Sequence, residues 1–103
     1  MAVDEKNVYV VDEAGAVHAL DKHTGASVWK QDKLQYRRLT PPVVFDGKIV
    51  VGDFEGYLHV LSADNGAIVG RLATDGTQVV SLVPGLSALF AQTAGGTVVA
   101  VRF

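Results

Sequence analysis

The 103-residue chain contains no cysteine, which excludes disulfides and thiolate metal sites but leaves an oxidising compartment open. It has no apolar run of about 18 residues, which excludes a transmembrane helix, and its first residues do not resemble a signal peptide. The formal net charge is −2 and no basic run is present, so no nucleic-acid partner is expected. No long 3.6-residue pattern occurs either, which argues against a helical repeat.

The segment 48–70 is predicted to form three short strands joined by two tight turns. The β-branched residues at 49–51 suit a pleated, half-buried surface. Asp-Phe-Glu-Gly at 53–56 is a turn signal, and a second strand is predicted over 57–61. Asn65-Gly66 is a strong signal for a short hairpin, and a third strand follows it. The pattern therefore predicts an antiparallel meander.

This meander has a near copy on each side. Gly15 and Gly56 lie 41 residues apart, Gly25 and Gly66 are also 41 apart, and Gly96 follows Gly56 by 40. A period of about 40 to 45 residues with four strands per unit is typical of propeller blades, whereas armadillo and HEAT repeats of similar length are helical. The repeat therefore favours a propeller.

The fold class expected is all-β, a partial β-propeller of about two and a half four-stranded antiparallel blades within one domain, 1–103. The blade pieces are roughly 1–31, 40–74 and 78–103, and residues 2–3 are the tail of the first inner strand. Closed propellers have about 4 to 8 blades, so the chain is expected to be part of a larger ring. Its open strand edges predict self-association of the fragment.

The turn between the third and fourth strands of the first unit carries a motif. Residues 19–29 read ALDKHTGASVW. Asp21 and Thr24 can cap turn amides with their side-chain oxygens, Gly25 can take a left-handed conformation, and Trp29 can bury a large ring between blades. The segment resembles the AxDxxTGxxxW motif of the PQQ-like repeat family, whose units are four-stranded blades like WD40 repeats.

The second unit departs from this motif. It keeps Gly66, but Gly70 stands where the first unit has Trp29. Packing between blades is therefore expected to be filled by other residues there, or to be looser. The positions predicted to be structural in the repeat are Gly15, Asp21, Thr24, Gly25, Trp29, Gly56, Gly66 and Gly96.

Four further segments resemble the C-terminal blades of the BamB family. They read LTPPV at 39–43, VVGD at 50–53, EGYLH at 55–59 and GGTV at 95–98. The resemblance implies an eight-bladed scaffold of the outer-membrane β-barrel assembly (BAM) machinery, without enzymatic activity or cofactor. It also implies a lipoprotein at the periplasmic face of the outer membrane, whose lipid anchor is absent from this chain.

The same resemblance implies a partner and a mode of closure. Members of the family bind the periplasmic POTRA domains of BamA through the full-length propeller. Their last blade is closed by a strand from the N-terminal end. The lack of a fourth strand in the third unit fits this closure, and Phe103 is then expected to be the natural C-terminus.

No catalytic, cofactor-binding or metal-binding residues are predicted. His18 and His59 occupy equivalent strand positions and could form a metal pair, but equivalent positions in adjacent blades are usually too far apart, so structural roles are favoured. Acidic residues in the second-to-third-strand turns could bind calcium or act as acids and bases. Turn chemistry is the preferred interpretation for all four of them, Asp12, Glu13, Asp53 and Glu55.

The long connection at 31–40 contains Tyr36-Arg37-Arg38. Loops on a rigid scaffold often carry binding residues, and Tyr and Arg are enriched in interface hot spots. Tyr36, Arg37 and Arg38 are therefore the predicted partner-binding residues. Two alternatives to a binding scaffold stay open: a fragment of a PQQ-dependent quinoprotein dehydrogenase, and a ligand-sensing propeller.

Overall fold

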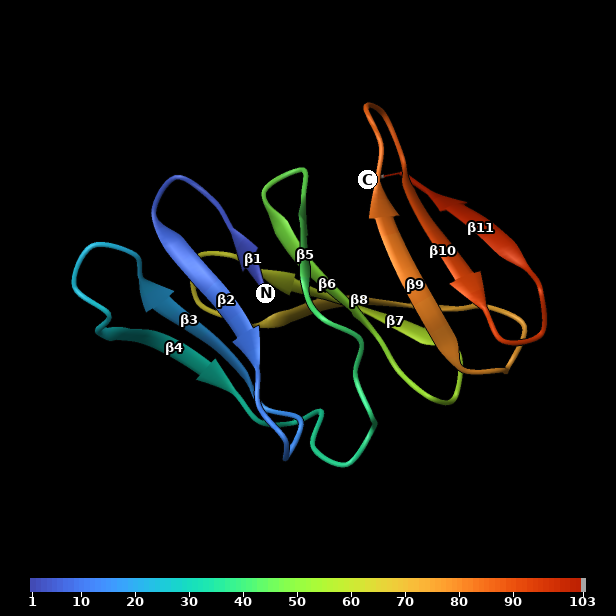
Figure 1. The fold of residues 1–103 in the computed structure, drawn as a ribbon, viewed down its shortest axis with the longest axis horizontal. Helices are drawn as coiled ribbons and strands as arrows, with labels where there is room; N and C mark the ends of the chain where they lie inside the picture. Colours follow the sequence, from blue (N-terminus) through green and yellow to red (C-terminus); the bar gives the residue numbers. More distant parts are fainter. Residues whose placement is uncertain (103) are drawn as a thin grey trace.

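The computed structural model describes residues 1–102, which form three antiparallel sheets side by side (Figure 1). Each sheet is a meander with its strands in chain order, so the expected all-β blades are confirmed. We call the sheets the first, second and third blade. Phe103, the expected natural C-terminus, lies outside the described residues. The strands are β1 (Ala2–Val3), β2 (Asn7–Val11), β3 (Val17–Asp21) and β4 (Ser27–Gln31); β5 (Val43–Phe45), β6 (Lys48–Gly52), β7 (Tyr57–Ser62) and β8 (Ile68–Ala73); and β9 (Val79–Pro84), β10 (Leu89–Thr93) and β11 (Val98–Val101).

The turn between the second and third strands has the same conformation in all three blades. Gly15, Gly56 and Gly96 have φ angles of 92°, 90° and 93°. Glycine occupies this left-handed region without the steric cost that a Cβ atom imposes. The glycines that reveal the period in the sequence therefore reverse the chain at equivalent points of each blade.

The first and second blades pack face to face around an aromatic core. Tyr9 and Trp29 come from the first blade, and Ile49, Val51 and Leu61 come from the second. The Tyr9 and Trp29 rings are tilted, with centroids 5.9 Å apart. Large rings bury much apolar surface, so this core is the bulkier of the two.

The buried residues between the second and third blades are aliphatic, and the partly buried Phe45 packs against them. Val50 and Leu58 of the second blade meet Val79, Leu89 and Val101 of the third. Successive side chains of a strand point to opposite faces, so β6 contributes to both cores. It is therefore buried from Ile49 to its end at Gly52.

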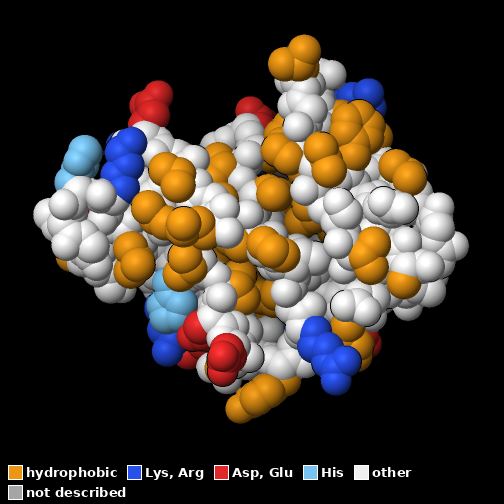
Figure 2. All heavy atoms as spheres, viewed as in Figure 1, with side chains coloured by type: hydrophobic (Ala, Val, Ile, Leu, Met, Phe, Trp, Pro, Cys, Tyr) orange, Lys and Arg blue, Asp and Glu red, His pale blue; other side chains and the backbone are white. Residues whose placement is uncertain are grey.

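The outward faces of the first and third blades keep hydrophobic side chains exposed. Val28 is 47% exposed on the first blade, and Phe90 and Val98 are 42% and 65% exposed on the third. Figure 2 shows hydrophobic side chains gathered over the β9–β10 hairpin at the upper right and around β2 at the left. Among residues 1–102, no helix is long and apolar enough to cross a membrane.

Candidate functional site

The motif of the first blade closes the turn between β3 and β4 by side-chain caps. Asp21 Oδ1 accepts hydrogen bonds from the amides of His23 and Thr24 at 2.8 and 3.0 Å. Thr24 Oγ1 accepts one from the Ala26 amide at 3.2 Å. The two backbone bonds to Asp21 lower the pKa of its carboxyl group. Local hydrogen bonding therefore accounts for the polar positions of the motif.

Trp29 connects this motif to the next blade. Its side chain is 8% exposed, and its Nε1 donates a hydrogen bond to the Ala63 carbonyl at 2.9 Å. A Cβ atom placed on Gly66 would lie only 2.4 Å from the indole ring. Gln31 also donates from Nε2 to the Gly66 carbonyl at 2.8 Å. The tryptophan of the first blade therefore packs against the β7–β8 turn of the second blade.

In the described part of the chain, the interface between the second and third blades has no tryptophan at the equivalent strand position. Gly70, at the position equivalent to Trp29, has room for a Cβ atom, whose nearest neighbour would be Val60 at 3.9 Å. Packing is tight instead at Gly52, where a Cβ atom would lie 2.5 Å from Val79 Cγ1. Val79 therefore fills this interface by close contact with the backbone of β6.

An aspartate and a histidine pair in each of the first two blades, a feature that the sequence analysis missed. His18 Nε2 lies 2.8 Å from Asp12 Oδ2, and His59 Nε2 lies 2.7 Å from Asp53 Oδ2. The two histidines are paired locally with these turn carboxylates. The identical six-residue Asp-to-His spacing in two repeats was the signal available in the sequence.

The two pairs differ in their surroundings. The Asp12 and His18 side chains are partly exposed, whereas those of Asp53 and His59 are buried. The hydrogen bond from His18, followed by the bond from the Ala16 amide, lowers the pKa of the Asp12 carboxyl group. Asp53 is fully buried and its Oδ1 accepts bonds from the Glu55 and Tyr57 amides, both at 2.9 Å.

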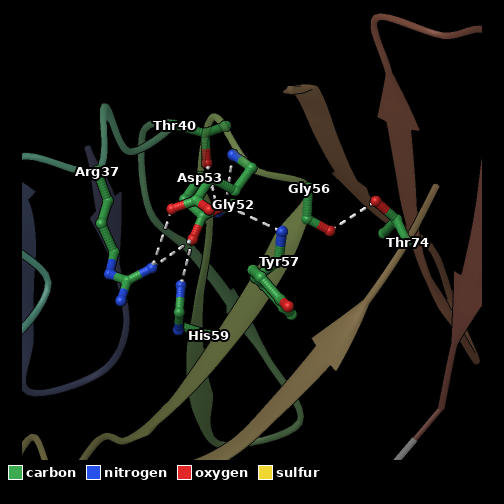
Figure 3. A network of polar contacts seen from close by, with 9 residues as sticks. Arg37, Thr40, Gly52, Asp53, Gly56, Tyr57, His59 and Thr74 are labelled. Atoms are coloured by element: carbon green, nitrogen blue, oxygen red, sulfur yellow. Dashed lines mark hydrogen bonds and ion pairs between the residues drawn. The ribbon is translucent and has the colours of Figure 1, made fainter. Parts of the chain in front are cut away.

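Arg37, which lies in the connection before the second blade, contacts the buried Asp53–His59 pair of that blade (Figure 3). Its Nη1 lies 3.4 Å from Asp53 Oδ2 and 3.7 Å from Glu55 Oε1. The close-up shows Arg37 and His59 converging on the Asp53 carboxylate. The Arg37 carbonyl also accepts a bond from the Phe54 amide at 3.0 Å. We call Arg37, Asp53 and His59 the buried latch.

The connection between β4 and β5, residues 32–42, carries the three predicted partner-binding residues. The Tyr36 amide donates to the Ala14 carbonyl at 3.1 Å. At its far end, Thr40 exchanges two bonds with Gly52 at 2.8 and 3.0 Å. This connection therefore spans the turns of two blades.

The three predicted residues face different surroundings. Tyr36 is 83% exposed and Arg38 is exposed, whereas the Arg37 side chain is about two-thirds buried. Tyr36 and Arg38 line a cleft of about 450 Å³, which Glu13 of the β2–β3 turn also lines. At the lower edge of Figure 2, acidic, basic and hydrophobic side chains lie close together, where Figure 1 places the β2–β3 turn and this connection.

The shorter connection between β8 and β9, residues 74–78, uses hydroxyl groups. Asp75 Oδ1 accepts a bond from Thr77 Oγ1 at 2.6 Å, and its Oδ2 accepts one from Thr93 Oγ1 at 2.7 Å. These bonds, the Thr77 hydroxyl first, hold the pKa of the Asp75 carboxyl group far below its usual range. Thr74 donates from its amide and its hydroxyl to the Gly56 carbonyl at 2.9 and 2.6 Å (Figure 3).

The residues described offer little for a bound ion. Across residues 1–102, no group of three or more His, Cys, Asp or Glu side chains is placed to hold a metal. Every buried polar side-chain atom in the same range has a hydrogen-bond partner. The polar groups of the site are therefore engaged in joining turns and connections.

Comparison with known proteins identifies the family. A family model described as outer membrane protein assembly factor BamB matches residues 1–103. The chain is 44% identical over 104 residues to the BamB of Alkalilimnicola ehrlichii and 38% identical over 103 residues to that of Bordetella pertussis. Each match covers 99% of this chain and 27% of the relative, so the chain spans about a quarter of the length of these curated relatives.

Solved structures give the same result for the fold. The crystal structure of BamB from Moraxella catarrhalis superposes with a TM-score of 0.92 at 33% identity, covering 99% of this chain and 30% of that one. The computationally designed Ika8 protein superposes with a TM-score of 0.81 at 16% identity, which concerns the fold alone, over 98% of this chain and 31% of that one. The chain belongs to the BamB family of outer membrane protein assembly factors.

Proposed function

We propose that this chain is a non-enzymatic binding module of the outer-membrane protein assembly machinery, acting at the periplasmic face of the outer membrane. The observation that carries the proposal is the family match over residues 1–103 combined with blades that superpose on a BamB structure. In this proposal residues 1–103 act as one partial propeller, with no cofactor. That the chain corresponds to the C-terminal blades of its longer relatives stays a prediction.

The proposed partner is the set of periplasmic POTRA domains of BamA, bound through the complete propeller. We assign the contact to the connection at 32–42, where Tyr36 and Arg38 are exposed beside a cleft. Tyrosine and arginine are enriched among residues that dominate binding energy. Two blade turns support the connection through backbone bonds, at Ala14 and Phe54. A rigid support of this kind lowers the entropy lost on binding.

The test is capture of purified POTRA domains by a purified complete propeller that contains this chain, measured by biolayer interferometry. Arg38→Glu is expected to weaken capture by roughly tenfold or more, the size of a typical hot-spot effect. Lys33→Glu is the matched control, because Lys33 is an exposed cation in the same connection, and it is expected to leave capture unchanged. Equal capture by both variants and the unchanged protein would remove this connection as the contact.

A second measurement separates the scaffold from the quinoprotein alternative. Pyrroloquinoline quinone with calcium is added and the melting temperature is recorded, since a ligand that binds the folded state raises it. The proposal expects no shift. A rise that depends on quinone concentration would favour a dehydrogenase fragment.

We also propose that the chain, taken alone, associates with itself. Within residues 1–102, β11 pairs with β10 on one side only, and the outward blade faces expose Val28 and Phe90. Unpaired strand edges are templates for pairing with another chain. Light scattering over a range of concentrations is expected to give an oligomer. A monomer at every concentration would contradict this.

A further inference from the structure

Two residues of the 32–42 connection adopt a conformation that side chains rarely take. Tyr36 has a φ of 65° and Arg38 a φ of 52°, and both flank Arg37. Non-glycine residues persist in the left-handed region when the surrounding structure over-determines them, and such residues cluster at binding sites. The structure must therefore contain a group that holds this tripeptide in place.

The buried latch is that group. Arg37 reaches the fully buried Asp53 carboxylate at 3.4 Å, and the same oxygen lies 2.7 Å from His59 Nε2. A buried charge whose partner is removed is costly, so withdrawal of Arg37 from Asp53 is opposed. The Phe54 amide bond to the Arg37 carbonyl fixes the backbone at the same residue. Side chain and backbone of Arg37 are therefore both anchored.

The anchoring of Arg37 sets the direction of its neighbours. With its side chain turned toward Asp53, the residues on either side are exposed, and Tyr36 lies 83% in solvent. Tyr36 and Arg38 both border the cleft against the first β2–β3 turn. The tripeptide thus divides into one residue whose side chain faces the protein and two whose side chains are exposed to solvent.

The equivalent pair in the first blade provides a contrast. The Asp12–His18 pair is partly exposed, and in the described part of the chain no arginine makes an ion pair with it. The connection at 74–78 has hydroxyl bonds to Asp75 in place of an arginine. Within residues 1–102, the arginine of the latch therefore lies in the connection where Tyr36 and Arg38 have positive φ angles.

We propose that Arg37 is a positioning residue, which acts through the buried Asp53–His59 pair to hold Tyr36 and Arg38 outward for a protein partner. This inference rests on the proposed function for its partner, but the latch itself does not. Arginine suits the role because its guanidinium reaches Asp53 and Glu55 together, and lysine, a compact point charge, substitutes for it incompletely.

The experiment compares Arg37→Met with Arg38→Met in the purified protein. Both changes remove one charge from adjacent positions and keep an unbranched side chain. The first readout is the rate of chymotrypsin cleavage after Tyr36, which does not depend on any partner. We expect Arg37→Met to raise this rate by roughly tenfold, the effect of losing a hydrogen bond to a charged group, and Arg38→Met to leave it unchanged.

The second readout is capture of purified POTRA domains. We expect both variants to weaken it, Arg37→Met through a loosened connection and Arg38→Met through a lost contact. Arg37→Lys is expected to recover part of the protection against chymotrypsin, and it also covers the case in which Arg37→Met fails to fold. Melting curves check that each variant is folded.

The outcomes separate the inference from the proposed function. Cleavage after Tyr36 that is equally slow in Arg37→Met and the unchanged protein overturns the positioning role. Cleavage that is fastest in Arg37→Met and intermediate in Arg37→Lys supports it. Faster cleavage with unchanged capture in every variant supports the latch and overturns the proposed docking surface.

Discussion

The interface between the first two blades and the interface between the second and third are joined by different kinds of contact. The first has an indole ring seated on Gly66 and a charged latch at Asp53. The second has Val79 against Gly52 and a set of hydroxyl bonds around Asp75. The same repeat can therefore be joined by an indole ring and an arginine–carboxylate pair, or by a valine and hydrogen bonds from hydroxyl groups to a carboxylate.

The comparison also separates structural from exposed residues. The central turn, 53–56, is bonded on one side by the 32–42 connection and on the other by Thr74. The equivalent β2–β3 turn of the first blade accepts a backbone hydrogen bond from Tyr36 on one side, and its Asp12–His18 pair is partly exposed. Removing equivalent side chains from these two turns should therefore lower the free energy of unfolding by unequal amounts.

The largest expected effect comes from Asp53→Ala. It leaves two turn amides, His59 and Arg37 without their shared acceptor, and disrupting a buried pair costs about 3–5 kcal/mol. Asp12→Ala is the matched control at the equivalent turn, and its expected cost is much smaller because the Asp12–His18 pair is partly exposed to solvent. Urea unfolding measures both, and equal losses would contradict the difference between the turns.

The next effect is expected from Gly66→Ala. Gly25 and Gly66 occupy equivalent turns with φ angles of 75° and 74°, but only Gly66 faces the Trp29 ring. Gly25→Ala should cost about 1–2 kcal/mol, the price of a left-handed alanine. Gly66→Ala should cost about 1–3 kcal/mol more, because an added Cβ overpacks the interface. Similar losses in urea unfolding would show that the ring is not tightly seated.

A smaller difference in stability is expected between two glycine substitutions in strands of the second blade, Gly52→Ala in β6 and Gly70→Ala in β8. Gly52→Ala brings a Cβ atom to 2.5 Å from Val79 Cγ1 and should cost about 1–3 kcal/mol. Gly70→Ala meets its nearest atom at 3.9 Å and should be neutral or stabilising by about 0.5–1 kcal/mol, since alanine suits a strand better than glycine. Thermal unfolding of the two variants tests whether Val79 fills this interface.

The smallest expected effects depend on pH. Burial, followed by the hydrogen bond to Asp4, raises the pKa of Tyr9 to about 12. Its contribution to stability is therefore complete below pH about 10 and is lost as the pH rises toward 12. The lowered pKa of Asp75 has the opposite sign, with a contribution present above pH about 4 that is lost as the pH falls further.

Two substitutions test whether Tyr9 and Asp75 cause these changes of stability with pH at the first and second blade interfaces. Tyr9→Phe should remove part of the alkaline loss of stability from the first interface, and Asp75→Asn should remove part of the acid loss from the junction of the second and third blades. Urea unfolding between pH 3 and 11 measures both. An acid slope unchanged in Asp75→Asn would contradict the assignment of that carboxylate.

Much of the fold followed from local patterns in the sequence. The spacing of Gly15, Gly56 and Gly96 indicated the blades because a left-handed turn residue is a local requirement. The strands followed from β-branched runs such as 49–51, and the Trp29 motif predicted a ring between blades. Each of these features depends on residues close together in the chain or on a repeated spacing.

Apart from the Trp29 ring, the contacts that join blades were not predictable in this way. Arg37 meets Asp53 across 16 residues only because the 32–42 connection follows an irregular path. Val79 reaches Gly52 because the second and third blades pack against each other, which no single-strand pattern specifies. The Asp53–His59 pair lies between these cases, because its six-residue spacing is repeated in the sequence and its burial depends on the neighbouring blade.

The most direct test of this account is a double-mutant cycle between Trp29 and Gly66 in the purified protein, followed by urea unfolding. Residues in contact show coupling of about 0.5–3 kcal/mol, whereas independent sites add. We predict that Gly66→Ala in a Trp29→Ala background costs no more than Gly25→Ala, because the added methyl group then meets a cavity in place of the ring. Additive losses in the two backgrounds would contradict the seating of one blade's tryptophan on the turn of the next.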